Sequence, residues 1–420
     1  MKNKQALQEN GGAARAAGAL AVKGFAHMIG EADRTADTSM YYGFTPVKAP
    51  ELKQEDLALA KQLASREALR RPEIADKEEL EPVSNAEEKI AIIRSYMENG
   101  MQELPHPLML YYRKPFPGSG LRRQPRDAHF GLDIIGSPRG VSEAIIIQTI
   151  VACLKEDGFD QFIVELNGVG DKDAMAKHER ELGLYYKKHS GTLDQKFKTT
   201  FKQSPFYMLT ETDAECRSFC EGAPKSVSYL GEAGRRHFME VLEYLESLDI
   251  PYRLNHALLG HQHFASHVLF KIKIVRDDGS ETTVATGARY NNLSRKLGFK
   301  KELPAMSATV RYRRAAAVSD RFRPIAPPKF YLVQFGNDAR RKCLSLIDML
   351  RRERIAVHHS LTRDKLLPQM AAAESLKVPF VLIMGQKEAL DGTVVVRNIG
   401  TRAQETLRLD ELIPYLRKLK

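Results

Sequence analysis

Histidines and cysteines with metal-like or redox-like spacing are the first groups in this sequence that could do chemistry. His261, His263 and His267 form an HxH pair with a third histidine four residues further on, which approaches a zinc-ligand pattern. Neither a carboxylate nor a cysteine accompanies them, so we expect no metal site. Cys216 and Cys220 are four residues apart on a predicted helix, which fits neither a CxxC redox pair nor the usual zinc spacing. We therefore expect reduced thiols that pack in the interior.

A second set of residues with chemical potential lies in short fragments spread along the chain. The compact signatures of common enzyme classes, namely a Walker loop, a GxSxG turn, HExxH and a Rossmann fingerprint, are absent. The order and spacing of the fragments therefore carry the information. In chain order they are Tyr42–Phe44, Ile93–Met101, His129–Gly136, Glu165–Gly168, Ala223–Leu230, Thr286–Leu293 and Gly385–Glu388.

Taken together, these fragments resemble histidyl-tRNA synthetase, a class II aminoacyl-tRNA synthetase. The resemblance covers nearly the whole chain from about residue 40. It implies a six-stranded antiparallel core, a helical insertion at roughly residues 168–255 and a C-terminal anticodon-binding domain. It also implies a homodimer, with the stretch around Tyr42 close to the two-fold interface.

The resemblance further implies a set of pocket residues with separate tasks. In this chemistry a carboxylate holds the substrate ammonium, and arginines stabilise the charge that develops on the α-phosphate. Glu87 stands where the family's substrate-binding glutamate would be. Arg113 stands where the arginine of the second class II motif would be. The other candidates for the substrate and ATP pocket are His129, Asp133, Arg289, Tyr290 and Arg314.

Several positions depart from the family's pattern where its chemistry needs particular side chains. By resemblance, Gly260 replaces the catalytic arginine, and Phe264 and Ala265 replace tyrosines of the histidine pocket. Arg311 replaces a glycine, so a long cation would project where adenosine needs bare backbone. Because losing one transition-state donor costs about 100- to 1,000-fold in rate, we predict a synthetase scaffold with an eroded active site.

Structural interpretations of the same residues remain open. Arg113 could belong only to a basic loop, and Glu87 could be a solvated carboxylate in an acidic run. Arg289 could pair with Asp133 inside the core as a structural salt bridge.

Hydrophobic patterning predicts an α+β core that positions these residues. Val268–Val275 alternates apolar and basic side chains, and a turn signal separates it from Thr282–Thr286, which indicates a half-buried hairpin. Arg235–Leu248 has the apolar stripe of an amphipathic helix. Ala128–Ile135 and Gln161–Leu166 are further strands, separated by long helical stretches. This mixture favours an antiparallel sheet over a doubly wound one.

A proline-rich linker at residues 324–328 divides the chain, because proline removes backbone donors and disfavours helix. Strands alternate with helices over residues 329–420, which predicts a small α/β domain with a largely parallel sheet. Residues 41–323 form the predicted synthetase-like core. Residues 1–40 are an N-terminal segment whose order the sequence does not predict.

The distribution of charge indicates a partner. Residues 1–294 carry 38 Lys and Arg against 41 Asp and Glu, whereas residues 327–420 carry 17 against ten. A basic C-terminal third predicts a polyanion, by resemblance tRNA or another RNA. The sequence has neither an 18-residue apolar stretch nor the apolar core of a signal peptide, so we expect a cytoplasmic protein that does not bind a membrane.

Three hypotheses about function follow. The preferred one is a histidyl-tRNA synthetase-like homodimer with weak or no aminoacylation, which binds tRNA or another RNA or regulates a partner. The first alternative is a functional but divergent histidine–tRNA ligase, which uses ATP with Mg²⁺ and in which Arg113, Arg289 and Arg314 share the phosphate work. The second is a regulatory subunit resembling that of ATP phosphoribosyltransferase. Residues 327–420 disfavour it, because those subunits generally lack the anticodon domain.

Overall fold

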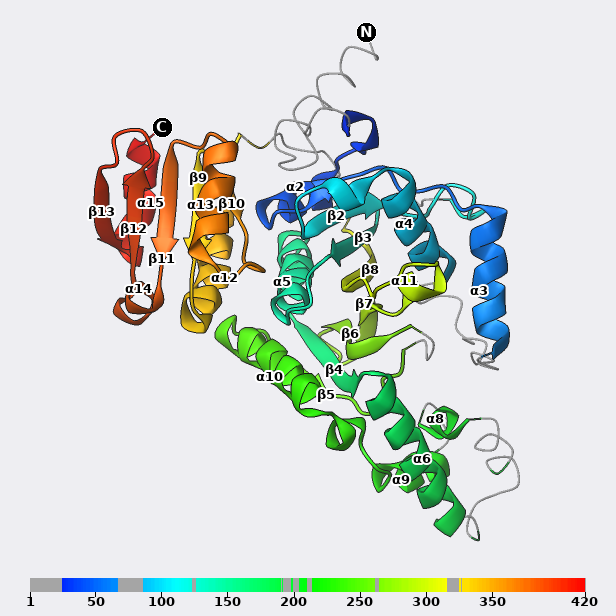
Figure 1. The fold of residues 1–420 in the computed structure, drawn as a ribbon. Coiled ribbons are helices and arrows are strands. Elements are labelled where there is room, and N and C mark those ends of the chain that lie inside the picture. The colour runs from blue at the N-terminus through cyan, green and yellow to red at the C-terminus, as the bar shows by residue number, and fades with distance from the viewer. Residues whose placement is uncertain are drawn as a thin grey trace.

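The computed structural model describes residues 25–66, 86–122, 126–189, 191, 198, 204–209, 214–260, 264–315, 325 and 327–419 (Figure 1). Predictions for residues 1–24, for His261 and His263, and for residues 324 and 326 of the proline-rich linker fall outside this part of the chain. No disulfide joins the four cysteines, all of which lie in described residues, as the sequence predicts.

The larger sheet explains why the first part of the chain alternates strands with long helices. In the described residues it has eight strands in the order β1-β2-β3-β8-β7-β6-β4-β5. The six strands from β2 to β4 in this order pair antiparallel, and the short β1 and β5 add parallel edges. The bounds are β1 Thr45–Pro46, β2 Leu108–Arg113, β3 Asp127–Ile135, β4 Phe162–Gly170, β5 Tyr252–Leu254, β6 Ser266–Val275, β7 Glu281–Arg289 and β8 Ala305–Arg313. The predicted hairpin is confirmed as β6 and β7, and the α+β class is confirmed with it.

Alternation along the strands gives the larger sheet two different faces. Phe130, Leu132 and Ile134 of β3 are completely buried in the main hydrophobic core, which α5 (Val141–Glu156) shares. Asp133 alternates with them and therefore lies on the opposite face. We call the first face, which α5 covers, the helix face, and the second, which carries Asp133, the open face.

The remaining helices of this part surround the larger sheet (Figure 1). The amphipathic helix predicted around Arg235–Leu248 is confirmed as α10, and its buried residues include Phe238, Val241 and Leu245. The helices α6, α8, α9 and α10 all come between β4 and β5 in the chain. Their bounds, with those of the other helices, are η2 Ala26–Met28, α2 Arg34–Tyr41, α3 Gln54–Arg66, α4 Ala86–Glu98, η3 Met101–Glu103, α6 Lys172–His189, α8 Pro205–Met208, α9 Ala214–Glu221, η5 Ser226–Tyr229, α10 Glu232–Ser247 and α11 Leu293–Lys296.

The smaller sheet, at the left of Figure 1, has five strands in the described residues, in the order β10-β9-β11-β12-β13. Three are parallel, but β11, β12 and β13 pair antiparallel, so the prediction of a largely parallel sheet is wrong for this half. The cause is local: the short helix α14 and the β12–β13 hairpin replace the longer crossover that a parallel strand requires. The bounds are β9 Phe330–Gln334, α12 Asn337–Arg352, β10 Val357–His359, α13 Leu366–Ser375, β11 Phe380–Met384, α14 Gln386–Asp391, β12 Thr393–Asn398, β13 Gln404–Arg408 and α15 Leu409–Lys418.

Helix α12 joins the two halves of the molecule. The hydroxyl of Tyr42 donates a 2.6 Å hydrogen bond to Asp348, and the Gln148 side chain donates a 2.9 Å bond to the Leu344 carbonyl. Arg351 adds an ion pair with Glu156 at the end of α5. These buried or half-buried polar contacts fix the smaller sheet against α2 and α5.

None of the helices in the described ranges is long and apolar enough to cross a membrane.

Candidate functional site

The open face of the larger sheet carries a buried polar cluster around Asp133 on β3. Tyr112 on β2 and Tyr290, just after β7, each donate a hydrogen bond to one oxygen of the Asp133 carboxylate. All three residues are buried. Burial raises the pKa of Asp133, while Lys89 and the two tyrosines act in the opposite direction. Asp133 is therefore a buried carboxylate whose acceptor capacity is used by the chain itself.

The side chain of Lys89 extends into this polar cluster. Helix α4 buries the successive residues Glu88 to Ile93 against the sheet, and so carries Lys89 into the interior. Its ammonium donates to the hydroxyl of Ser307 on β8 and lies 5.4 Å from the centre of the Tyr290 ring. Burial lowers the pKa of Lys89 to about 8, although Asp133 acts to raise it. The ammonium thus lies inside the polar cluster.

A second lysine completes the cluster. Lys114, immediately after β2, forms an ion pair with Glu88 and donates a 3.1 Å hydrogen bond to Thr309. Glu87, the predicted substrate-binding glutamate, is only half-buried, so the neighbouring Glu88 and not Glu87 contributes the carboxylate to this cluster. Sequence reasoning missed Glu88, Lys89 and Lys114. The signal available was a charged pair that directly precedes the apolar run of α4.

Apolar side chains close the cluster. Phe264 is buried in the same hydrophobic cluster as Tyr112, Tyr290 and Phe116. Gly260 lies so close to its neighbours that a Cβ atom there would be 2.6 Å from the Cβ of Ala265 and 2.8 Å from Leu269. Contacts this short exclude any side chain at position 260 unless the backbone moves. Ala265 is buried with Leu269 in a separate small cluster.

Arg289 lies on the helix face, away from Asp133. Its guanidinium makes two hydrogen bonds of 2.8 and 2.6 Å to the Glu143 carboxylate, and both side chains are completely buried. Two further bonds reach the backbone carbonyls of Ser137 and Arg139. Burial alone would raise the pKa of Glu143, but Arg289 and His237 hold it well below its usual range. The alternative in which Arg289 pairs with Asp133 is therefore wrong, because strand alternation turns the two side chains to opposite faces.

The other two candidate arginines are also bound to carboxylates. Arg314, beyond the end of β8, donates a 2.8 Å hydrogen bond to Asp157 at the end of α5, and both side chains are almost completely buried. Arg113 forms an ion pair with Glu31 and lies 3.6 Å from Asp33. Arg113, Arg289 and Arg314 therefore do not converge on Asp133, and each guanidinium is neutralised by an acid of this chain.

The end of the open face nearest Asp127 carries Arg311 and His129. Arg311 on β8 lies 3.4 Å from the carboxylate of Asp127 on β3. Burial lowers the pKa of the neighbouring His129 to about 3, and the charges of Lys114 and Arg311 contribute. His129 is therefore neutral at pH 7 and supplies a hydrogen-bonding ring, not a cation.

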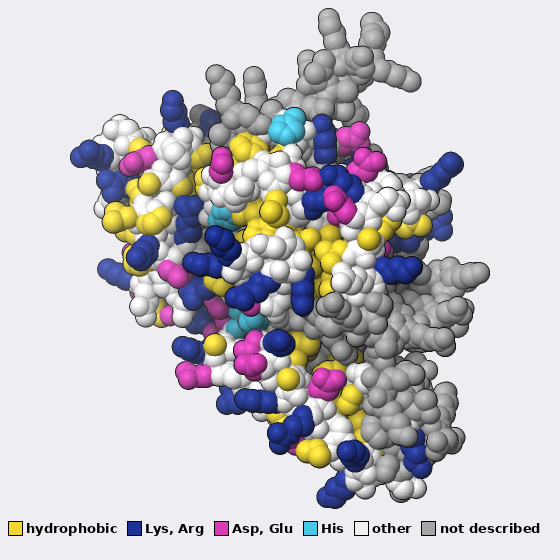
Figure 2. All heavy atoms as spheres, turned by 45° about the vertical axis from the view of Figure 1, so that its right-hand side comes forward, with side chains coloured by type: hydrophobic (Ala, Val, Ile, Leu, Met, Phe, Trp, Pro, Cys, Tyr) yellow, Lys and Arg dark blue, Asp and Glu magenta, His cyan; other side chains and the backbone are white. Residues whose placement is uncertain are grey.

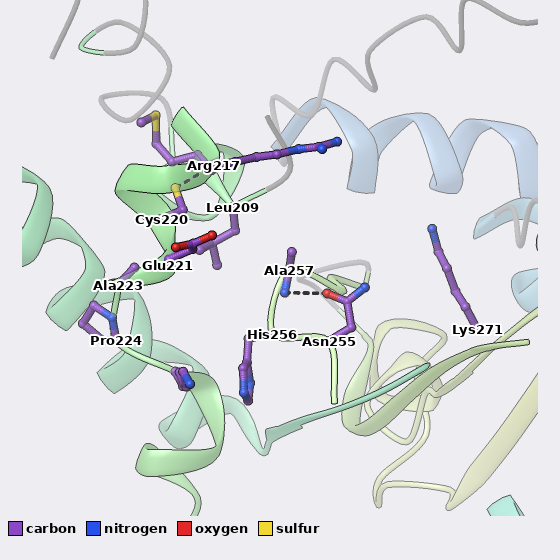
Figure 3. A pocket seen from close by; sticks show the side chains of 12 residues that line it. Leu209, Arg217, Cys220, Glu221, Ala223, Pro224, Asn255, His256, Ala257 and Lys271 are labelled. Atoms are coloured by element: carbon purple, nitrogen blue, oxygen red, sulfur yellow. Dashed lines mark hydrogen bonds between the residues drawn. The ribbon is translucent and has the colours of Figure 1, made fainter. Parts of the chain in front are cut away.

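A pocket of about 690 Å³ lies elsewhere, between the helices inserted after β4 and the edge of the larger sheet. Figure 3 shows Arg217 and Cys220 projecting from α9 on one side, His256 from the loop after β5, and Lys271 from β6 on the other. Basic groups prevail over the acidic Glu221. The full lining is Met208, Leu209, Arg217, Cys220, Glu221, Ala223, Pro224, Lys225, Asn255, His256, Ala257 and Lys271. Such a surface suits a phosphate-bearing chain.

Lys and Arg side chains are spread over the face of the molecule that Figure 2 shows, together with fewer Asp and Glu side chains.

Comparison with known proteins gives this geometry a context. Residues 329–419 match the family described as "Anticodon binding domain". A crystal structure of apo histidyl-tRNA synthetase from S. aureus aligns with 90% of this chain and 92% of its own, with 23% identity and a TM-score of 0.47. In this chain the antiparallel core is followed by the domain that matches the anticodon-binding family.

The curated relatives specify the class further. A histidine–tRNA ligase of Dehalococcoides mccartyi is 28% identical over 336 residues, which are 78% of this chain and 79% of that protein. A histidine–tRNA ligase of Pelodictyon phaeoclathratiforme is 25% identical over 395 residues, which are 90% of each. Over most of its length, the chain is therefore similar to histidine–tRNA ligases.

Proposed function

We propose that this chain is a histidyl-tRNA synthetase-like protein that binds tRNA or a related RNA and forms little or no aminoacyl adenylate. The observation that carries the proposal is the commitment of Arg113, Arg289 and Arg314 to carboxylates of the chain. Adenylate formation places extra negative charge on the α-phosphate, and free cations must stabilise that charge. An arginine already paired with a carboxylate of the chain contributes less to this, because part of its charge is compensated. The effect is largest for Arg289 and Arg314, whose pairs are buried.

The occupied cluster around Asp133 supports the same proposal. Lys89, Lys114 and Phe264 fill the place where an amino acid and the adenine ring would need space. The substitutions at Gly260, Phe264, Ala265 and Arg311 add to this, since none of them restores a hydroxyl or a suitably placed cation.

RNA binding rests on separate observations. Residues 329–419 match an anticodon-binding domain, and residues 327–420 carry 17 basic against ten acidic side chains. The basic pocket lined by Arg217, Lys225 and Lys271 offers a second contact for phosphates. We propose that the protein acts as a homodimer, and that residues 41–323 and 329–420 are its two working domains.

The test measures RNA binding and aminoacylation on the same protein. Filter binding with histidine tRNA should give a specific complex whose affinity falls steeply with salt, whereas charging with radioactive histidine should remain at background. The control for RNA binding is the chain lacking residues 329–420, and a histidine–tRNA ligase of a relative is the positive control for charging. Charging at the rate of that control would refute the proposal.

A functional but divergent ligase is the second candidate, and the 28% identity with a histidine–tRNA ligase over 78% of the chain favours it. It would require ATP with Mg²⁺ and a rearrangement that frees Arg113 or Arg314. The presence of the anticodon-binding domain continues to disfavour a regulatory subunit of ATP phosphoribosyltransferase.

A further inference from the structure

The groups around Asp133 have the composition of a site for a primary ammonium ion. A primary ammonium has three N–H donors and no acceptor, so it needs oxygen acceptors and a compensating negative charge. The Ser307 hydroxyl accepts a hydrogen bond from the ammonium, and the face of Tyr290 adds a favourable cation–π contact at 5.4 Å. Asp133, whose oxygens accept from Tyr112 and Tyr290, contributes its negative charge. The present occupant of these groups is the side chain of Lys89.

We propose that this cluster is a binding site for a primary ammonium group, and that Lys89 acts as a built-in ligand that closes it to free amines and amino acids. This inference deepens the proposed function, because a pocket filled by its own lysine explains why an amino acid would not be activated. It concerns ammonium recognition alone, so its test reads amine binding and not adenylate chemistry.

The charge balance of the cluster explains why Lys89 stays in place. Lys89 and Lys114 face Asp133 and Glu88, so the buried group is neutral as a whole. Removing one member leaves an uncompensated buried charge, which is strongly destabilising. An external cation that enters the vacated space would restore the balance, as the Lys89 ammonium does now.

The shape of the ligand follows from the side chain that is removed. Lys89→Ala deletes three carbons and the ammonium group but keeps the Cβ atom, so the missing piece corresponds to n-propylammonium. Asp133, Ser307 and Tyr290 stay unchanged and define the end that receives the charge. We expect propylammonium to bind to the Lys89→Ala protein and to be excluded from the unaltered protein.

The experiment compares thermal unfolding in about 100 mM propylammonium chloride and in potassium chloride at equal ionic strength. Propylammonium should raise the Tm of Lys89→Ala by at least about 1 °C, with saturation as its concentration increases. Three controls should show no such rise: the unaltered protein, Lys89→Met, in which an apolar chain fills the space, and Lys53→Ala, which removes an exposed lysine paired with Glu98. The double variant Lys89→Ala/Asp133→Asn should lose the response, because the carboxylate is gone.

An equal response to the two salts in Lys89→Ala, or the same rise in Lys89→Met, would overturn the inference. If Lys89→Ala is insoluble, it is refolded from urea with and without propylammonium. Recovery of folded protein only with the amine supports the site, and failure under both conditions refutes it. If Lys89→Ala responds to propylammonium and the unaltered protein does not charge tRNA, both proposals are supported. If Lys89→Ala responds but the unaltered protein does charge tRNA, only the proposed function is refuted.

Discussion

The most informative structural perturbation is Arg289→Met, because Arg289 is both a candidate for ATP binding and a buried partner of Glu143. The substitution deletes two charge-assisted hydrogen bonds of 2.8 and 2.6 Å to Glu143, and two bonds to backbone carbonyls. Both side chains are 0% exposed, so Glu143 would be left as a buried charge supported only by His237. Breaking a buried pair in this way costs about 3–5 kcal/mol of unfolding free energy.

Urea unfolding followed by circular dichroism measures this loss. The double variant Glu143→Gln/Arg289→Met removes both charges, so its loss should be smaller than the sum of the two single losses by about 0.5–3 kcal/mol. Arg113→Met is the matched control, since its guanidinium is partly exposed and pairs with the exposed Glu31. We expect the control to lose no more than about 1 kcal/mol.

The pH dependence follows from the Glu143 carboxyl. Its pKa in the folded protein lies well below the ordinary value of 4.5, so the pair contributes fully above pH 4.5 and loses its contribution as the pH falls further. The stability difference between the unaltered protein and the double variant should therefore shrink below pH 4.5. An Arg289→Met protein as stable as the unaltered one would refute the structural role of this arginine.

Three further predictions concern other parts of the molecule. The pKa of Lys89 is lowered from 10.5 to about 8 in the folded protein, so the unfolded chain binds more protons between these two pH values. The unaltered protein should therefore gain stability relative to Lys89→Met as the pH rises from 8 to 10. Urea unfolding curves with the same pH dependence in both proteins would contradict this. Lys271→Glu should weaken tRNA binding several-fold and lower its salt dependence, whereas Lys61→Glu on α3 should not. Equal effects of the two substitutions in filter binding would show that the basic pocket does not contact RNA. Gly260→Arg should destabilise the protein without adding pyrophosphate exchange, because a Cβ would already lie 2.6 Å from Ala265; a stable variant with new exchange activity would show that the site can be rebuilt.

Patterns of hydrophobicity predicted the fold well because they repeat over many residues. The hairpin β6–β7 and the helix α10 were found from alternation and from an apolar stripe, and both lie where the sequence placed them. The antiparallel pairing of β12 and β13 was missed because β13 is a short polar strand without an apolar alternation.

The candidate site was harder to predict because residue type does not determine the face of a strand. Arg113 matches a motif arginine by type, but Tyr112 and Lys114, its neighbours, are the residues that reach the buried cluster. The partners of Arg289 and Arg314 are Glu143 on α5 and Asp157 just after it, about 150 residues earlier in the chain. No local pattern reveals contacts over such separations.

Lys89 shows the same limit from another direction. A lysine next to an acidic residue near the start of a helix usually indicates a solvated surface. Only the packing of α4 against the open face shows that this ammonium is buried and hydrogen-bonded to Ser307 within the cluster around Asp133.

Histidine-dependent exchange between ATP and pyrophosphate tests the central claim most directly, because it reports adenylate formation without requiring tRNA. Because Arg113, Arg289 and Arg314 are bound to carboxylates and Lys89 fills the cluster around Asp133, exchange should not rise above the rate measured without histidine. Exchange that depends on histidine and reaches the rate of a related histidine–tRNA ligase would contradict the account.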